Sequence, residues 1–176
     1  MRSTVLIAGS GGQGVLLAGK VLAEAALSER MNVTWYPSYG AAMRGGPANC
    51  TVIISDFPIG SPVASKVDVL VVLSRMSLSS FEDRLQVGGL LVMDSSNIKA
   101  YPGRDDLNLV DVPVRSLGPA IEQQKLSNIV LLGVFIAKTG ILSTDSITEA
   151  IRKVSPKDME DNLRAFNLGK EFIRKH

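Results

Sequence analysis

Cysteine and histidine are scarce in this sequence, and both shortages limit the chemistry open to it. The single cysteine, Cys50, cannot form a disulfide within the chain, and it cannot hold an iron–sulfur cluster alone because such clusters need several thiolates. The single histidine, His176, is the last residue, where chains usually fray. We therefore expect no histidine-based triad, no metal site in this chain and a reducing, cytoplasmic location.

Excess charge and long apolar runs are also lacking. Lys and Arg total 19 against 17 for Asp and Glu, so the net charge of +2 creates no strong field to attract nucleic acid or an acidic membrane surface. No apolar run reaches the roughly 18 residues that a membrane span needs, and the first residues lack the apolar region of a signal peptide. We expect a soluble, unexported protein with neither nucleic acid nor membrane as a partner.

The size of the chain favours a single domain. Its 176 residues, 45% of them hydrophobic, are enough to bury one core but too few for two comfortable domains. The sequence contains no internal repeat, no low-complexity tract and no linker. We expect one domain over residues 1–176.

Short β-rich apolar runs alternate with helix-like stretches along most of the chain. We expect strands at Thr4–Ala8, Val33–Tyr36, Asn49–Ser55, Val67–Leu73, Leu90–Asp94 and Leu109–Val112. We expect helices at Gln13–Ser28, Leu78–Gln86, Asn128–Lys138, Asp145–Lys153 and Met159–Arg174, the last with an apolar stripe of Met159, Leu163, Phe166 and Ile173. This alternation predicts an α/β, Rossmann-like fold with a mostly parallel sheet and helices on both faces.

A glycine loop follows the first expected strand. Gly9, Gly11 and Gly14 satisfy the pattern G-x-G-x-x-G, and Gly12 and Gln13 lie within it. Glycines allow the backbone to approach a ligand closely, and the next helix offers free N–H groups to an anion. A dinucleotide site also requires an acidic residue at the end of the second strand, where this chain has Tyr36–Ser38 instead. An anion site and a merely tight turn both remain open.

A second glycine pattern overlaps the first. Residues Gly14 to Lys20 fit G-x-x-x-x-G-K, but Val21 stands where a phosphate-binding loop needs Ser or Thr to ligate Mg²⁺. The intervening residues are apolar helix formers. This excludes a nucleoside triphosphatase.

The connection after the second expected strand, from Pro37 to Pro47, carries polar side chains among glycines. Its candidate site residues, with the first residue of the next strand, are Ser38, Tyr39, Arg44, Gly45, Gly46 and Asn49. Both loops should lie at the carboxyl edge of the sheet, where open α/β sheets bind ligands. Arg44, followed by two glycines, can present its guanidinium to a carboxylate or phosphate. The alternative is that Arg44 is a solvated loop residue and Tyr39 a packing contact.

Five segments together resemble a known family. In chain order they are AGSGGQG, SYGAAMRGGPANC, VLVVLS, GGLLVMDSS and NIVLLG, and they resemble the gamma subunits of 2-oxoacid:ferredoxin oxidoreductases over nearly the whole chain. GGQG combined with SYG and RGG is more specific than either glycine motif alone. The chain is most similar to gamma subunits of 2-oxoglutarate or branched-chain oxoacid enzymes, with pyruvate enzymes also open. Ala41-Ala42 replaces the Pro-Glu usual in the family, and Pro47 replaces a small hydroxyl residue.

The resemblance implies a supporting role in a larger oxidoreductase. The complex would convert a 2-oxoacid, coenzyme A and oxidised ferredoxin to acyl-CoA, CO₂ and reduced ferredoxin. Thiamine diphosphate, Mg²⁺ and iron–sulfur clusters would belong to alpha and beta subunits, with a delta subunit in some complexes. The isolated chain should be inactive and can pair with itself to cover apolar surface. The two loops would form one face of a cleft between subunits, through Gly9, Gly11, Gly12, Gln13, Gly14, Ser38, Tyr39, Arg44, Gly45, Gly46 and Asn49.

Two other functions remain open from the residues alone: a free-standing NAD(P)-dependent reductase that uses the glycine loop, and a non-catalytic module that binds an anionic metabolite. Three further features favour structural roles. We expect Asp94 to cap a turn or helix rather than touch a ligand, residues Glu122–Lys125 to form a solvated helix face, and Asn128–Lys138 to lie mainly in the core.

Overall fold

The computed structural model describes residues 1–39, 47–118 and 126–176. Its six strands form one sheet in the order β2-β3-β1-β4-β5-β6. The strands are β1 (Arg2–Ser10), β2 (Asn32–Tyr39), β3 (Pro47–Ser55), β4 (Val67–Val72), β5 (Leu85–Asp94) and β6 (Asn108–Val112). The pairs β1–β4, β4–β5 and β5–β6 are parallel, whereas β3 is antiparallel to both β1 and β2. The expected α/β fold with a mostly parallel sheet is confirmed.

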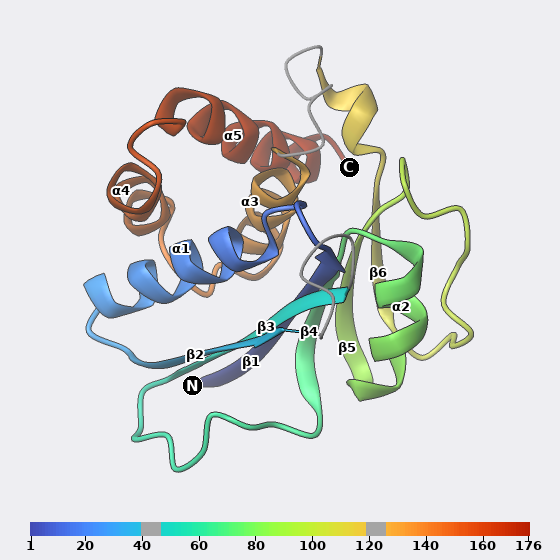
Figure 1. The fold of residues 1–176 in the computed structure, drawn as a ribbon, viewed down its shortest axis with the longest axis horizontal. Helices are drawn as coiled ribbons and strands as arrows, with labels where there is room; N and C mark the ends of the chain where they lie inside the picture. Colours follow the sequence, from blue (N-terminus) through green and yellow to red (C-terminus); the bar gives the residue numbers. More distant parts are fainter. Residues whose placement is uncertain (40–46, 119–125) are drawn as a thin grey trace.

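Helices cover both faces of the sheet, as expected (Figure 1). The helices are α1 (Val15–Ser28), α2 (Arg75–Phe81), α3 (Ser127–Thr139), α4 (Thr144–Val154) and α5 (Met159–Lys175). The helices α1, α3, α4 and α5 lie on one face and α2 lies on the other. Short 3₁₀ helices at Glu82–Arg84 and Val114–Leu117 complete the described elements.

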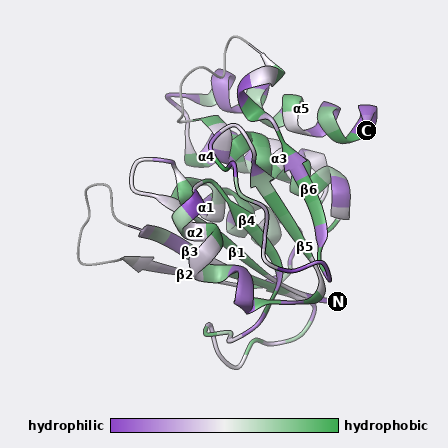
Figure 2. Cartoon of the chain, turned by 90° about the vertical axis from the view of Figure 1, so that its right-hand side faces the viewer, coloured by the Kyte–Doolittle hydropathy of each residue, from purple (hydrophilic) through white to green (hydrophobic). Residues whose placement is uncertain are grey.

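The core consists of two layers separated by the sheet. Val5 to Ala8 of β1 are fully or almost fully buried, because alternate side chains enter the two layers. Figure 2 shows hydrophobic strands at the centre of the sheet, with hydrophilic segments concentrated in the outer helices and connections. The expectation of a first strand buried on both faces is confirmed.

The prediction of a helix at Leu78–Gln86 is wrong at its C-terminal end. It begins earlier, where the Ser74 hydroxyl accepts the N–H of Ser77 at 3.2 Å, and it ends at Phe81. The chain is already in β5 at Leu85, which lies opposite Val67 of β4. Burial of Leu85 in the sheet therefore overrides the local helical pattern.

The hairpin strands are longer than the sequence indicated. Pro37 and Ser38 belong to β2, and Pro47 begins β3, so they lie in the sheet rather than in the loop between them. Pro37 is tolerated because β2 is an edge strand of the described sheet. Because of this lengthening, the first residue of β3 lies opposite the last residue of β1, where the glycine loop begins.

Helix α3 is a core helix, as expected. Every residue from Ser127 to Ile136 is buried. It therefore offers little apolar surface to a partner. Within the described ranges no helix has the length and apolar character needed to cross a membrane.

Helices α3 and α5 pack in close contact, which buries small residues of α5 beside its expected apolar stripe. The most buried residues are Asn162, Ala165, Phe166 and Gly169, while Leu163 and Ile173 of the expected stripe are partly buried against the core. A Cβ added to Gly169 would lie 2.0 Å from the carbonyl oxygen of Val130, and one added to Gly133 would lie 2.3 Å from that of Phe166. Two glycines therefore set the distance between these helices.

Replacing Gly169 with Ala should destabilise the fold. Alanine favours a helix by about 1 kcal/mol over glycine, but the added methyl meets rigid backbone and must push the helices apart. We expect a net loss of about 1–3 kcal/mol in the free energy of unfolding, measured by urea denaturation. Gly60→Ala is the matched control, because no atom lies within 4 Å of the added Cβ. Equal stability of the two variants would contradict the close crossing.

Candidate functional site

The two predicted loops lie side by side at one end of the sheet. Ser10, the last residue of β1, is opposite Pro47, the first residue of β3. Asn49 lies between Ala8 of β1 and Ser38 of β2, with which it pairs on either side. The end of β1, where the glycine loop begins, therefore adjoins the open end of the β2–β3 hairpin.

The described chain includes only part of the second loop. Ser38 is exposed at the end of β2, Asn49 is half-buried in β3, and Tyr39 pairs with Ala48. Arg44, Gly45 and Gly46 lie outside the described residues, as do Glu122–Lys125. The roles predicted for these residues stay predictions.

The glycine loop combines left-handed backbone at two glycines with the N-terminus of α1. Gly12 and Gly14 have φ values of 89° and 70°, in the left-handed region that favours glycine. Gly14 is the N-cap of α1, and no side chain caps this helix end in the described chain. The first N–H groups of α1 therefore lack the partner that a capping side chain would give them.

Gln13, a predicted cleft residue, has a side chain that is bonded within the chain. Its Oε1 accepts the N–H of Ser10 at 2.6 Å, and its Nε2 donates to the carbonyl of Leu73 at 3.1 Å. Both polar atoms of the side chain are thus bonded within the chain. The Gln13 side chain ties the glycine loop to the end of β4.

Asn128 supports the loop from below and was not identified as a site residue from the sequence. Its side chain is almost completely buried, and Nδ2 donates to the carbonyl of Gly14 at 2.8 Å. A Cβ on Gly14 would lie 2.4 Å from this nitrogen, so the contact requires glycine. The one signal in the sequence was an amide at the start of the otherwise apolar segment NIVLLG.

A cavity of about 260 Å³ borders the loop on the side of α1 and α5. Its lining is Gly12, Gly14, Leu17, Leu126, Asp158, Asp161 and Asn162. The two aspartates are exposed in and next to the first turn of α5, where they complement the helix dipole. Their charge opposes an anion in this cavity. An anion would therefore bind more favourably on the side of the glycine loop that faces the β2–β3 hairpin.

Asp94 takes the turn role that the sequence favoured. Its carboxylate accepts the N–H of Ser96 at 2.9 Å and Nδ2 of Asn97 at 2.8 Å, which closes the turn after β5. The side chain has no exposed surface, and burial raises the pKa of its carboxyl group. Asp94 is a structural residue at the rim of the sheet.

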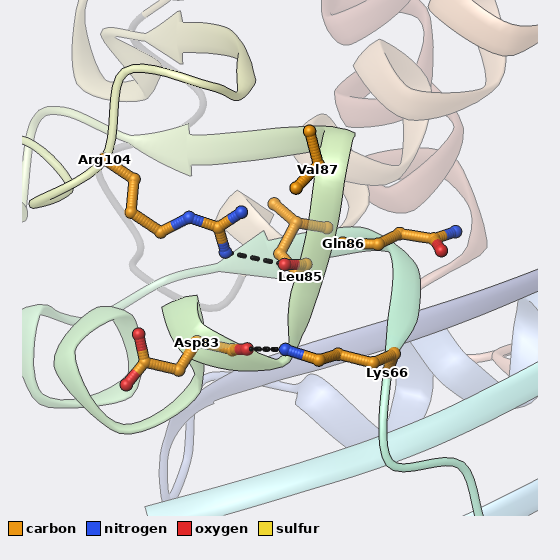
Figure 3. Close-up of a pocket in the computed structure, with 6 residues that line it drawn as sticks. All are labelled: Lys66, Asp83, Leu85, Gln86, Val87 and Arg104. Carbon is orange, nitrogen blue, oxygen red and sulfur yellow. Dashed lines mark hydrogen bonds between the residues drawn. The ribbon is translucent and has the colours of Figure 1, made fainter.

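A larger cavity, of about 630 Å³, lies at the opposite end of the parallel strands, where β4 and β5 begin (Figure 3). The Arg104 guanidinium donates to the carbonyl of Leu85 at 2.6 Å and to both carboxylate oxygens of Asp106. Lys66 donates to the carbonyl of Asp83 at 2.8 Å. Both cations hold chain segments together, so we interpret this cavity as structural. Among the described residues no group of three or more His, Cys, Asp or Glu side chains could hold a metal ion.

Cys50 lies in β3 close to the start of α1, and its thiol is unreactive because it is buried and protonated. It is fully buried, and its Sγ donates to the carbonyl of Val15 at 3.6 Å. Burial raises the pKa of its thiol to about 12, so almost none is ionised near neutral pH. Cys50 fills space between β3 and α1.

One family model matches almost the whole chain. It is described as pyruvate ferredoxin/flavodoxin oxidoreductase, and the match covers residues 4–172.

Two curated relatives and one solved structure are similar over nearly the full chain. The "Ketoisovalerate oxidoreductase subunit VorA" of Methanothermobacter thermautotrophicus is 38% identical over 98% of this chain and 36% of its own length. The "2-oxoglutarate synthase subunit KorC" of Methanocaldococcus jannaschii is 34% identical over 99% of this chain and 95% of its own. A crystal structure of a keto/oxoacid ferredoxin oxidoreductase gamma subunit from Geobacter sulfurreducens has a TM-score of 0.85 at 30% identity, covering 97% of this chain and 95% of that one. The chain thus spans about a third of the VorA-type relatives and nearly all of the KorC-type relative.

The isolated chain should not bind NAD⁺ or NADP⁺ specifically. The Gln13 side chain fills the end of the crevice between β1 and β4, and β2 ends without the carboxylate that a ribose needs. Isothermal titration calorimetry at millimolar nucleotide should give no saturable heat. A saturating isotherm with a Kd below about 100 μM, or roughly 5.5 kcal/mol of binding free energy, would contradict this prediction.

Proposed function

We propose a subunit role for this chain because it belongs to the pyruvate ferredoxin/flavodoxin oxidoreductase family. It acts as the gamma subunit of a 2-oxoacid:ferredoxin oxidoreductase, as a single domain over residues 1–176. The complex converts a 2-oxoacid, coenzyme A and oxidised ferredoxin to acyl-CoA, CO₂ and reduced ferredoxin, in the cytoplasm. The names and full-length similarity of the KorC-type relative and of the solved gamma subunit support this function.

The redox cofactors of the complex belong to its other subunits. An iron–sulfur cluster does not fit this chain, whose lone cysteine is buried and protonated. Thiamine diphosphate, with Mg²⁺, supplies the chemistry of decarboxylation when bound to alpha and beta partners. This chain contributes position and charge instead of electron transfer.

The paired ends of β1 and β3 carry this proposal. Because Ser10 lies opposite Pro47, the glycine loop and the hairpin end form one continuous rim. The uncapped start of α1 favours negative charge on that rim. The rim forms one wall of a cleft closed by the partner subunits, and it binds the anionic part of coenzyme A or the substrate carboxylate.

Co-purification tests the subunit role directly. With a tag on this chain at its native locus, we expect larger subunits that contain thiamine diphosphate and iron in the same purified complex. The complex should reduce ferredoxin when a 2-oxoacid and coenzyme A are both supplied, and the isolated chain should not. Turnover of an oxoacid by the purified chain alone, or recovery of the chain without partners, would disprove the role.

Replacing Arg44 with Ala in the assembled complex tests the anion contact. A charge-assisted hydrogen bond is worth about 1.5–3 kcal/mol, so the Michaelis constant for coenzyme A or for the oxoacid should rise roughly ten- to a hundredfold. Arg152→Ala is the control, because Arg152 pairs with Glu149 on the surface of α4. Steady-state kinetics that are unchanged for both substrates would remove Arg44 from the site.

A further inference from the structure

The ladder between β1 and β4 is interrupted at the glycine loop. In a parallel pair, evenly spaced hydrogen bonds link each strand alternately to the other. Ala8 lies opposite Val72, and the N–H of Leu73 donates to the carbonyl of Ala8 at 2.9 Å. The next bond of this ladder would run from the N–H of Ser10 to the carbonyl of Leu73.

The side-chain amide of Gln13 lies between those two groups instead. Ser10 donates to Oε1 at 2.6 Å, and Nε2 donates to the Leu73 carbonyl at 3.1 Å. These partners fix the orientation of the amide, because Ser10 offers a donor and Leu73 an acceptor. One direct bond of the ladder is thus replaced by a bridge through the Gln13 amide.

Gly9 makes room for this bridge. A Cβ on Gly9 would lie 2.7 Å from Oε1 of Gln13 and 3.2 Å from Cβ of Leu73. The backbone N–H of Gln13 also donates to the carbonyl of Ser10 at 3.2 Å, which closes the turn. Gly9 and Gln13 therefore act as a unit, and this glycine has a role without any ligand.

The bridge lies where open α/β sheets usually bind their ligands. Helix α1 covers one face of the sheet and α2 the other, so the chain reverses its winding between β1 and β4 (Figure 1). The crevice at the carboxyl ends of two such strands is the common ligand position. Gln13 fills it here, which leaves the β3 side of the glycine loop for a ligand.

We propose that Gln13 is a positioning residue whose amide is a wedge between β1 and β4, turning the glycine loop toward the β2–β3 hairpin. The inference rests on the proposed function, with coenzyme A as the anionic ligand of the rim. When the amide is removed, Ser10 pairs directly with Leu73 and the loop moves toward β4. The N–H groups at the start of α1 then no longer face the anion.

Two substitutions at Gln13 in the assembled complex test the wedge. Gln13→Met keeps the length of the side chain without its donor and acceptor, and Gln13→Glu keeps the acceptor but places a carboxylate against the Leu73 carbonyl. We expect both to raise the Michaelis constant for coenzyme A about tenfold, with kcat within about twofold of the wild type. The Michaelis constant for the oxoacid should stay unchanged.

Gln86→Met is the matched control. The Gln86 amide also makes a side-chain hydrogen bond, to Asp68, but it lies at the opposite end of the parallel strands. This variant should have wild-type kinetics. If Gln13→Met left the Michaelis constant for coenzyme A within about twofold of the wild type, or if Gln86→Met changed it equally, the positioning role would be overturned.

NMR spectroscopy of the isolated, ¹⁵N,¹³C-labelled chain separates this inference from the subunit role. Coupling through the hydrogen bond should link the Ser10 nitrogen to Cδ of Gln13 in the wild type. In Gln13→Met, it should link that nitrogen to the carbonyl carbon of Leu73. Absence of the first coupling, or of the second, rejects the wedge even if the complex is active. An inactive wild-type complex rejects the subunit role and leaves the wedge to be decided by these couplings.

Discussion

The pairing of β1 with β3 is the constraint on which the candidate site depends. The two strands are in register from Arg2 opposite Ser55 to Ser10 opposite Pro47. Burial fixes this register, because Val5 and Ile7 of β1 enter the same core layer as Cys50, Val52 and Ile54 of β3. A slip of one residue would turn the apolar side chains of one strand to the wrong face. The hydrophobic core thus determines which two loops meet at the rim.

Most of the fold could be predicted from periodicity, because buried strands and helices need apolar residues at regular spacings that are visible in the local sequence. The run Thr4–Ala8 and the apolar segment from Asn128 read correctly as a buried strand and a buried helix. The boundaries failed where a distant contact decided them. Leu85 joins the sheet by pairing with Val67, and the most buried residues of α5 include those that contact α3 around Gly133. No window of local sequence contains either partner.

The candidate site could be predicted only in outline. Glycine patterns identified both loops, and the order of the strands placed them at one edge. The supports of the glycine loop come from far along the chain: Gln13 reaches Leu73, 60 residues away, and Asn128 reaches Gly14, 114 residues away. Such contacts follow from the assembled sheet and helices. The glycine motif alone does not distinguish an anion site from a tight turn.

The position of Pro37 in the outermost strand has a consequence for how this protein meets others. Among the described strands β2 pairs with β3 alone, and proline contributes no N–H to any strand that might add to the other side. Addition of a further strand would leave one of its carbonyl groups without a partner in the middle of the new ladder. Sheet extension, whether by a second copy or during aggregation, is therefore discouraged next to the hairpin. Recognition at that border falls to side chains, which can distinguish a correct partner from a wrong one.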